Sequence, residues 1–224
     1  MDAQPTSSPT RALPARAILS DAVYEATKAM IMDHAIPPGT RIAIDGLARD
    51  LGVSPTPVRE ALARLESEEL VVKEPLRGYR ATHLLTAEEL EDLYDFRRLI
   101  EPWAASRAAE RLDEAGAARL RAEMESVDEA TAADYRLLTA HDTRFHTLIA
   151  ELSGSRQLLQ ALVRTHCHLH IFRLHHVRGV GQAPIEEHQR IAEAILRRDR
   201  QGAQQAMQAH LTASITQRLR ADEA

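Results

Sequence analysis

The sequence of 224 residues has little of what marks secreted or membrane proteins. It holds one cysteine, Cys167, so no disulfide can form within the chain and a reducing compartment is expected. No apolar run approaches the roughly 20 residues needed to cross a bilayer, and the N-terminus lacks the apolar core of a signal peptide. These absences predict a cytoplasmic protein with no membrane partner.

Aromatic residues and excess positive charge are also scarce. Aromatic side chains make up 4% of the chain, whereas Ala, Leu, Arg and Glu are abundant, which favours a mainly α-helical protein. The formal net charge is −5, and neither half of the chain has the basic excess of a non-specific nucleic-acid binder. A sequence-specific DNA-binding protein is consistent with this balance, because it needs its cations on one face only.

The stretch 41–79 has the pattern of a winged helix-turn-helix. A short helix is predicted to end near Leu51, and Gly52 can adopt the positive φ that a sharp turn requires. Ser54 is placed to cap a second helix with prolines in its first turn. The apolar stripe of this helix comprises Val58, Ala61, Leu62 and Leu65. Two short strands then complete a wing, so the second helix has the shape to enter a DNA major groove.

This stretch resembles the GntR family of bacterial transcription regulators. The run from Leu51 to Leu62 (LGVSPTPVREAL), the following RLE and the Gly78-Tyr79 pair of the wing match the pattern of that family. The resemblance implies that double-stranded operator DNA is the partner. We expect the DNA contacts to come from Arg49, Ser54, Thr56, Pro57, Arg59, Arg64, Arg77 and Gly78.

Two positions depart from the family pattern. Pro55 stands where members usually have an arginine that contacts a base, so the operator cannot be inferred from the family. Arg59 and Thr56 remain to supply base and phosphate contacts. Glu69 stands where a glycine usually precedes the Leu-Val pair.

The remainder of the chain is expected to be helical apart from an N-terminal arm. Residues 1–16 are rich in Pro, Ser, Thr and Ala and predict a disordered arm, and residues 17–83 form the winged helix-turn-helix domain. Thr86 is a predicted N-cap, with Glu89 three residues later in a capping box. Six helices are predicted beyond it, over 86–112, 114–130, 132–152, 156–178, 184–198 and 200–220.

A helical region of this length after a winged helix resembles the FCD ligand-binding domain of the FadR-type GntR proteins. The six helices resemble the shorter, VanR-like variety. The expected fold is therefore mainly α, with the winged helix-turn-helix followed by an all-α antiparallel bundle over residues 84–222. The resemblance implies that this domain binds an effector and a metal ion and forms the homodimer.

Four residues of the bundle form a candidate metal site. Asp142 and His146 are four apart on one predicted helix, so both side chains point to the same side. Antiparallel packing of the last two predicted helices can bring His188 and His210 level. One carboxylate and three imidazoles suit Zn²⁺ or Ni²⁺, with open positions for water or an effector carboxylate. The FCD domain has the same pattern, which implies a divalent metal ion here. A single histidine is more often a surface residue than a ligand, so the assignment depends on all four together.

A second group of histidines follows Thr165. On a continuous helix, residues two apart point about 200° apart, so His166, His168 and His170 cannot form one site. His166 and His170 share a face and are candidates to line an effector pocket. A solvated or core-packing role is expected for most of this group, and Cys167 is expected to be a small buried hydrophobic residue.

The segment 95–101 (DFRRLIE) resembles the first helix of the FCD domain. The resemblance implies that Arg97 binds the carboxylate of a small organic-acid or sugar-acid effector, a role that suits a bidentate guanidinium. The alternative is a salt bridge from Arg97 to Asp92, Glu101 or a neighbouring helix.

These observations predict a homodimeric transcription regulator that is not an enzyme and whose operator affinity depends on a small carboxylate held at a metal ion. A metal-sensing regulator, with the ion itself as effector, is one alternative. A metal-dependent enzyme is another, because such an ion can activate water, although no motif supplies a further general base. A bundle that serves only for dimerisation is the third.

Overall fold

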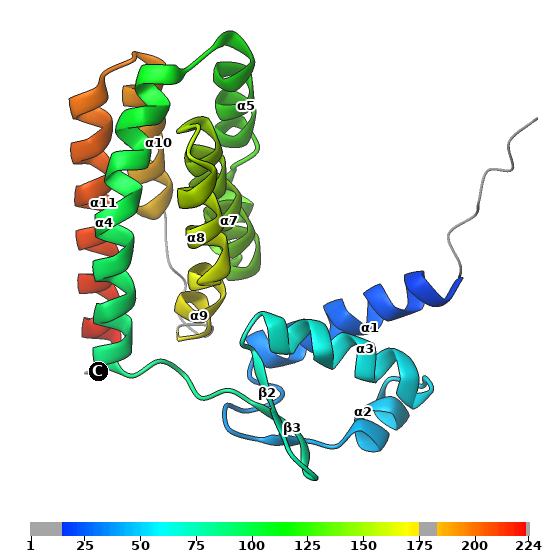
Figure 1. Cartoon of the computed structure of the whole chain (residues 1–224). Helices are drawn as coiled ribbons and strands as arrows, with labels where there is room; N and C mark the ends of the chain where they lie inside the picture. Colours follow the sequence, from blue (N-terminus) through cyan, green and yellow to red (C-terminus); the bar gives the residue numbers. More distant parts are fainter. Residues whose placement is uncertain (1–14, 175–182, 223–224) are drawn as a thin grey trace, which may run out of the picture. The chain divides into compact units, whose positions relative to one another are not determined.

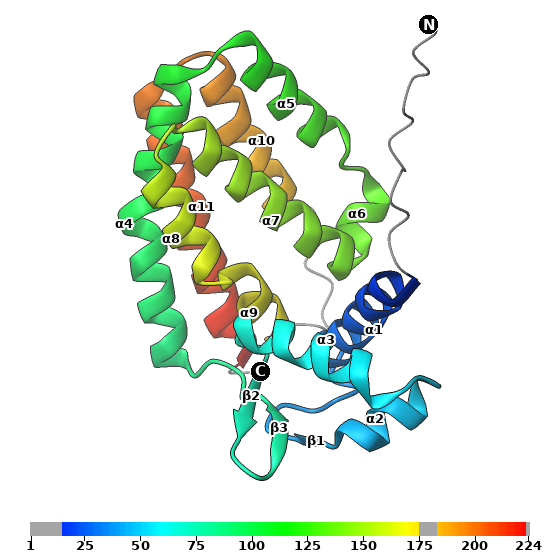
Figure 2. The same cartoon turned by 45° about the vertical axis from the view of Figure 1, so that its right-hand side comes forward.

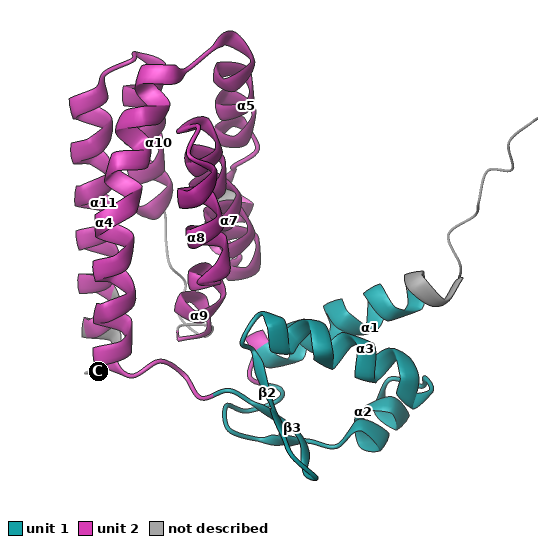
Figure 3. Ribbon diagram, in the orientation of Figure 1, with its two compact units in different colours: residues 1–31, 35–82 teal, residues 32–34, 83–224 magenta. Residues whose placement is uncertain are grey.

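The computed structural model of the chain (Figure 1) describes residues 15–174 and 183–222. These residues divide into two compact units (Figure 3), one ending at Thr82 and the other beginning at His83, with the short segment Met32–His34 counted in the second unit. Within the described residues, no helix is long and apolar enough to cross a membrane. The arm expected over residues 1–16 lies outside the described residues except for its last two, with which the first helix begins.

The first unit is a winged helix-turn-helix. Its described elements are α1 (Ala15–Met32), β1 (Arg41–Ile42), α2 (Ile44–Asp50), α3 (Pro55–Ser67), β2 (Val71–Glu74) and β3 (Gly78–Ala81). The strands form an antiparallel sheet in the order β1-β3-β2, in which β2 and β3 make the wing. The helices and the wing were predicted, whereas β1 was not, because two residues carry too little pattern to be recognised.

The apolar stripe of α3 anchors this helix in the core of the unit. Val58, Ala61, Leu62 and Leu65 are all 0% exposed, as their spacing predicted. Ser54 occupies the N-cap position with an extended backbone, but its side chain makes no capping hydrogen bond. The helix is therefore held by burial of one face, and its opposite face is left to solvent.

Helices α2 and α3 both end in a Schellman turn, in which the residue directly after the C-cap has a left-handed backbone. At the end of α2 this residue is Gly52, with φ 67°, and at the end of α3 it is Glu69, with φ 58°. The amide of Glu69 donates to the carbonyl of Glu66 at 3.0 Å, and the amide of Leu70 donates to the carbonyl of Leu65 at 3.0 Å. A Cβ is strained in this conformation, which gives the physical reason for the glycine of the family pattern.

Replacing Glu69 by glycine is expected to stabilise the first unit by about 1 kcal/mol. Relief of the left-handed strain, roughly 1–2 kcal/mol, is partly offset by the greater freedom of glycine in the unfolded chain. Urea denaturation of the full-length protein measures the change. Glu66→Gly, within α3, is the control and is expected to lose about 1 kcal/mol. Equal losses in the two variants would contradict strain at Glu69.

The second unit is an all-α bundle (Figure 2). Its described helices are α4 (Ala87–Arg111), α5 (Glu114–Glu125), α6 (Glu129–Ala133), α7 (Tyr135–Leu152), α8 (Arg156–Arg164), α9 (Cys167–Arg173), α10 (Ala183–Leu196) and α11 (Arg200–Asp222). Helix α4 packs along α11 and α7, and α10 packs against α11 and α4. The capping box at the start of α4 is confirmed, since Thr86 Oγ1 accepts from the Glu89 amide at 3.2 Å and the Thr86 amide donates to Glu89 Oε2 at 2.8 Å.

The six predicted helical stretches are helical over most of their described residues, with two differences. The short helix α6 precedes α7 as a separate element. The stretch predicted as one helix over 156–178 is divided into α8 and α9, because His166 takes a left-handed conformation with φ 44° and becomes the N-cap of α9. The end of that stretch, residues 175–178, lies outside the described residues.

The core of the bundle is apolar except in its middle. Fully buried apolar side chains are contributed by several helices, among them Leu120, Leu138, Phe145, Ile149, Ile191, Ile195, Met207 and Leu211. Charged and imidazole side chains are buried among them. Because an isolated buried polar group is costly, this interior polar cluster requires a partner or a function.

Candidate functional site

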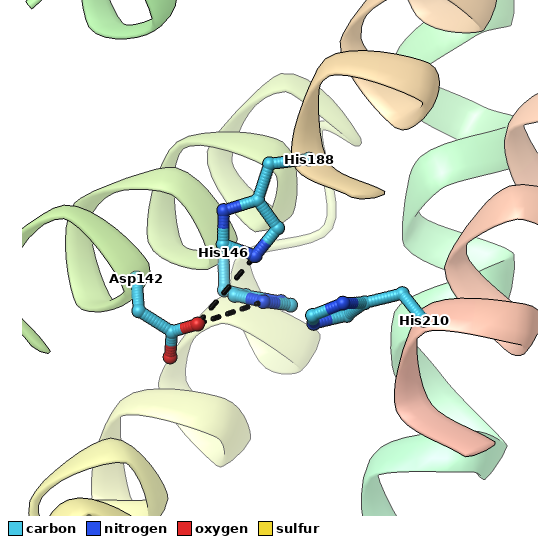
Figure 4. Close-up of side chains that lie close together, drawn as sticks. All are labelled: Asp142, His146, His188 and His210. Atoms are coloured by element: carbon cyan, nitrogen blue, oxygen red, sulfur yellow. Dashed lines mark ion pairs between the residues drawn. The ribbon is translucent and has the colours of Figure 1, made fainter. Parts of the chain in front are cut away.

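Four buried side chains from three helices meet inside the bundle (Figure 4). Asp142 and His146 come from α7, His188 from α10 and His210 from α11. One ligand atom from each of the four lies within 4.8 Å of those of the other three. The four residues singled out by their spacing are thus brought together in one cluster.

Two imidazole nitrogens that face Asp142 in this cluster lie too far from its oxygen for ordinary hydrogen bonds. His188 Nε2 lies 3.5 Å from Asp142 Oδ1, and His146 Nε2 lies 3.7 Å from the same oxygen. Within the described part of the chain, neither Nε2 atom has a hydrogen-bond partner, although both residues are at most 1% exposed. A buried polar atom left unpaired costs about 1–3 kcal/mol. A cation between these atoms would satisfy them, so the residues present fit a divalent metal ion.

The outer nitrogens of two of the three imidazoles, those of His146 and His210, are held in place by carboxylates. The Nδ1 atom of His146 is bonded to Glu101, and that of His210 lies 2.8 Å from Glu187 Oε2. When Nδ1 donates its hydrogen to a carboxylate, Nε2 keeps its lone pair for a metal. This arrangement of outer carboxylate, imidazole and inner nitrogen is typical of metal-binding histidines.

The charge states favoured by the cluster also suit a cation. Burial lowers the pKa of His188 well below its ordinary value, and His210 nearby lowers it further. Burial also lowers the pKa of His146, to about 4, against the opposing effect of Glu101. Burial by itself would raise the pKa of Asp142, but His168, which contacts its other oxygen, and then His146 and His188 hold it well below its usual range. Neutral imidazoles and an ionised carboxylate are the forms that bind metal ions.

Arg97 lies behind His146 in the core. Its side chain is 2% exposed, its Nε donates to Glu101 Oε1 at 2.5 Å, and its Nη2 lies 3.5 Å from His146 Nδ1. The structure therefore contains the salt bridge to Glu101 that was the alternative role for this arginine. Binding of an effector carboxylate by Arg97 stays a prediction.

Of the second group of histidines, His168 reaches the cluster. Its Nδ1 lies 2.5 Å from Asp142 Oδ2, and its ring centre lies 5.1 Å from that of His146. No pattern in the sequence singled it out, because the helical-wheel argument assumed one continuous helix through His166. His166 itself is half-buried at the N-cap of α9, and His170 is buried within α9. Effector roles for these two stay predictions.

The residues that support the candidate ligands were not identified as such from the sequence. The spacing of Glu101, four residues after Arg97 on one helix, did indicate a salt bridge between these two residues. Glu187 is the neighbour of His188 in the sequence, but its side chain contacts a different member of the cluster, His210. Contacts of this kind depend on tertiary packing and leave no mark in the local sequence.

The exposed face of α3 carries the predicted DNA contacts at its N-terminal end. Ser54, Thr56 and Arg59 are exposed there, whereas Pro57 is buried. Helix N-termini and exposed hydroxyls are suited to phosphate contacts, and an arginine is suited to a base edge or a phosphate.

The other predicted contacts differ in how freely they can reach DNA. Arg49 and Arg77 are exposed, and Gly78, the first residue of β3 after the turn of the wing, has φ 90°. Arg64 is engaged within its own unit: it donates to Asp21 Oδ1 at 2.5 Å, and its guanidinium lies 3.9 Å from the ring centre of Tyr24.

Comparison with known families covers both units of the chain. Residues 19–80 match the family described as "Bacterial regulatory proteins, gntR family", and residues 92–213 match the "FCD domain".

Curated relatives of similar length have regulatory descriptions. The chain is 29% identical over 192 residues to the "Uncharacterized HTH-type transcriptional regulator YdhC" of Bacillus subtilis, with 84% of this chain and 85% of the relative covered. It is 30% identical over 230 residues to the "Putative L-lactate dehydrogenase operon regulatory protein" of Escherichia coli, with 92% and 88% covered. Among solved structures, "E. coli McbR/YncC" aligns with a TM-score of 0.70 at 22% identity over 90% of this chain and 97% of that chain, which shows a shared fold.

Proposed function

Because the chain belongs to the GntR family of bacterial transcription regulators and carries an FCD domain, we propose that a metal ion and a small carboxylate effector in the bundle control its affinity for operator DNA. Membership makes the protein a DNA-binding transcription regulator rather than an enzyme. The metal, the effector and the control of operator affinity are the proposed parts.

One observation carries the metal site. The buried Nε2 atoms of His146 and His188, which have no hydrogen-bond partner among the described residues, point toward the same oxygen of Asp142, and His210 lies beside them. We assign the four as ligands of Zn²⁺ or Ni²⁺, ions that accept imidazole and carboxylate together. When bound, the ion would supply a Lewis acid that attracts an effector oxygen.

The effector we propose is a small organic acid or sugar acid. A carboxylate oxygen is a natural further ligand for such an ion, and one relative is described as a putative regulator of an L-lactate dehydrogenase operon, which concerns a small hydroxy acid. Arg97, His166 and His170 are the candidates for the remaining effector contacts. Effector binding would shift the two DNA-binding units of a dimer, with a coupling of about 1–3 kcal/mol.

A metal-sensing regulator is the second candidate. Four protein ligands are enough to complete a tetrahedral ion, so the cluster can bind metal without an effector. Operator affinity measured in metal-free and metal-loaded protein separates the two. A response to metal alone favours the sensor, whereas a response that requires a carboxylate favours the effector site.

The operator itself can be found by selecting bound duplexes from a random DNA library with full-length protein. A homodimer is expected to enrich a two-fold-symmetric site, whose half-sites lie in successive major grooves. The enriched bases would also show which sequence is recognised when a proline, Pro55, occupies the position of the usual arginine. Folded, metal-loaded protein that enriches nothing at low salt would contradict specific DNA binding.

Arg59→Ala is expected to weaken operator binding by about 1–3 kcal/mol, roughly 5- to 150-fold in Kd. The exposed guanidinium is removed from the face of α3 while the buried stripe is left intact. Fluorescence anisotropy with the selected operator measures the change. Arg98→Ala, in the bundle, is the control for loss of one positive charge. Equal affinities of the two variants would remove Arg59 from the recognition surface.

A further inference from the structure

His188 is supported from behind by a second imidazole rather than by a carboxylate. Its Nδ1 lies 2.9 Å from His141 Nε2, and His141 Nδ1 lies 2.8 Å from Glu123 Oε1. His141 is 0% exposed, whereas the Glu123 side chain is 12% exposed. Glu123 belongs to α5, His141 to α7 and His188 to α10, so a chain of hydrogen bonds connects three helices.

The direction of these hydrogen bonds follows from the chemistry of the two ends. An ionised carboxylate only accepts, so His141 Nδ1 donates its hydrogen to Glu123. With a neutral ring, His141 Nε2 then accepts from His188 Nδ1. His188 Nε2 is left with its lone pair, and this is the atom that has no hydrogen-bond partner in the described part of the chain.

We propose that Glu123 and His141 form a relay that positions His188 as a metal ligand. The inference rests on the proposed metal site and deepens it. The relay would hold the outer nitrogen of His188 in place. Glu101 does this for His146, and Glu187 does it for His210. Outer partners of this kind fix the tautomer and the orientation of a metal-binding histidine.

The outer end of the relay is itself held. Arg144 Nε lies 3.0 Å and 3.2 Å from the two oxygens of Glu123, and the Arg144 side chain is half exposed. An arginine, a glutamate and a histidine thus contact one another in turn, as Arg144, Glu123 and His141 here and as Arg97, Glu101 and His146 in the core. Through Glu123, the helix α5 contributes to metal affinity although it carries none of the four ligands.

Two substitutions at His141 test the relay in full-length protein. Leucine fills similar space but neither donates nor accepts, and it is expected to weaken Zn²⁺ binding about 10- to 100-fold. Glutamine offers both a donor and an acceptor and is expected to recover most of the affinity. Competition with a chromophoric chelator measures Kd, and circular dichroism of the metal-free variants checks that each is folded.

A matched pair of carboxylates controls for charge. Glu123→Leu is expected to weaken Zn²⁺ binding, because His141 loses its acceptor. Glu151 lines a surface pocket together with Glu123 and pairs with Arg119. Among the described residues it makes no contact with the relay, so Glu151→Leu is expected to leave Kd unchanged.

A spectroscopic readout separates positioning from simple packing. In Zn²⁺-loaded protein labelled with ¹⁵N-histidine, the wild type is expected to show a slowly exchanging hydrogen on His188 Nδ1, and His141→Leu to exchange it faster. An unchanged Kd in His141→Leu, or equal losses in the leucine and glutamine variants, would overturn the relay. Wild-type protein that binds no Zn²⁺ would overturn the metal site itself, and this is seen before any variant is compared.

Discussion

Alanine at both His146 and His210 is expected to abolish metal uptake by the folded protein. The double variant removes two of the four proposed ligands and leaves Asp142 and His188, which are too few to hold a divalent ion in competition with water. Elemental analysis after dialysis against Zn²⁺ should find about one ion per chain in the wild type and almost none in the variant. The bundle itself should remain helical, because most of its core is apolar.

The control for this experiment is His83→Ala, which removes an exposed imidazole outside the cluster. It is expected to bind metal as the wild type does. If the double alanine variant does not fold, glutamine at both His146 and His210, which keeps much of the ring volume, tests the same site. Full metal occupancy in either folded variant would contradict the assignment of the ligands.

Glu101→Ala is expected to lower the free energy of unfolding of the bundle by about 3–5 kcal/mol. The substitution leaves Arg97 charged and unsatisfied in the core, where its side chain is 2% exposed, and it also removes the partner of His146 Nδ1. Guanidinium denaturation of metal-free protein measures this loss without a contribution from the ion.

A surface pair on the same helix provides the matched control. Arg98 and Asp95 form an ion pair at 2.6 Å, but the Asp95 side chain is 71% exposed. Asp95→Ala is therefore expected to cost less than about 1 kcal/mol. Similar losses for Glu101→Ala and Asp95→Ala would contradict a special role for the buried pair.

Removing both buried charges separates the two roles of Glu101. A double replacement of Arg97 and Glu101 by leucine is expected to cost less stability than Glu101→Ala, because no charge is left unpaired. Zn²⁺ affinity should nevertheless fall about 10- to 100-fold, since His146 still lacks its outer partner. Unchanged affinity in this variant would show that Glu101 serves stability alone.

The features that the sequence predicted well are those set by local spacing. The buried stripe of α3 and the capping box at Thr86 follow from helical periodicity and from the chemistry of a helix end. Asp142 and His146 are neighbours for the same reason, because four residues make about one turn. To predict that His188 and His210 lie beside this pair, the resemblance to a known helical bundle was needed as well.

The features that escaped prediction depend on packing between distant segments. Whether Arg97 faces an effector or a carboxylate is decided by what lies beside it, and Glu101 takes that place. The left-handed conformation of His166 could not be predicted, because the residue is neither glycine nor asparagine. It divides a predicted helix, and His168 as a result contacts Asp142. One unforeseen helix break was enough to conceal the proximity of His168 to the cluster.

The four proposed ligands come from three separate helices, and this has a consequence for the lifetime of the protein in the cell. An unfolded chain cannot hold these side chains together, so the proposed ion would bind the folded state alone. At a free ion concentration of about 100 times Kd, such binding adds about 2.7 kcal/mol to stability. In a metal-starved cell the unfolded fraction would rise and proteases would shorten the half-life of the regulator. Gene control would then respond to metal supply through the number of regulator molecules.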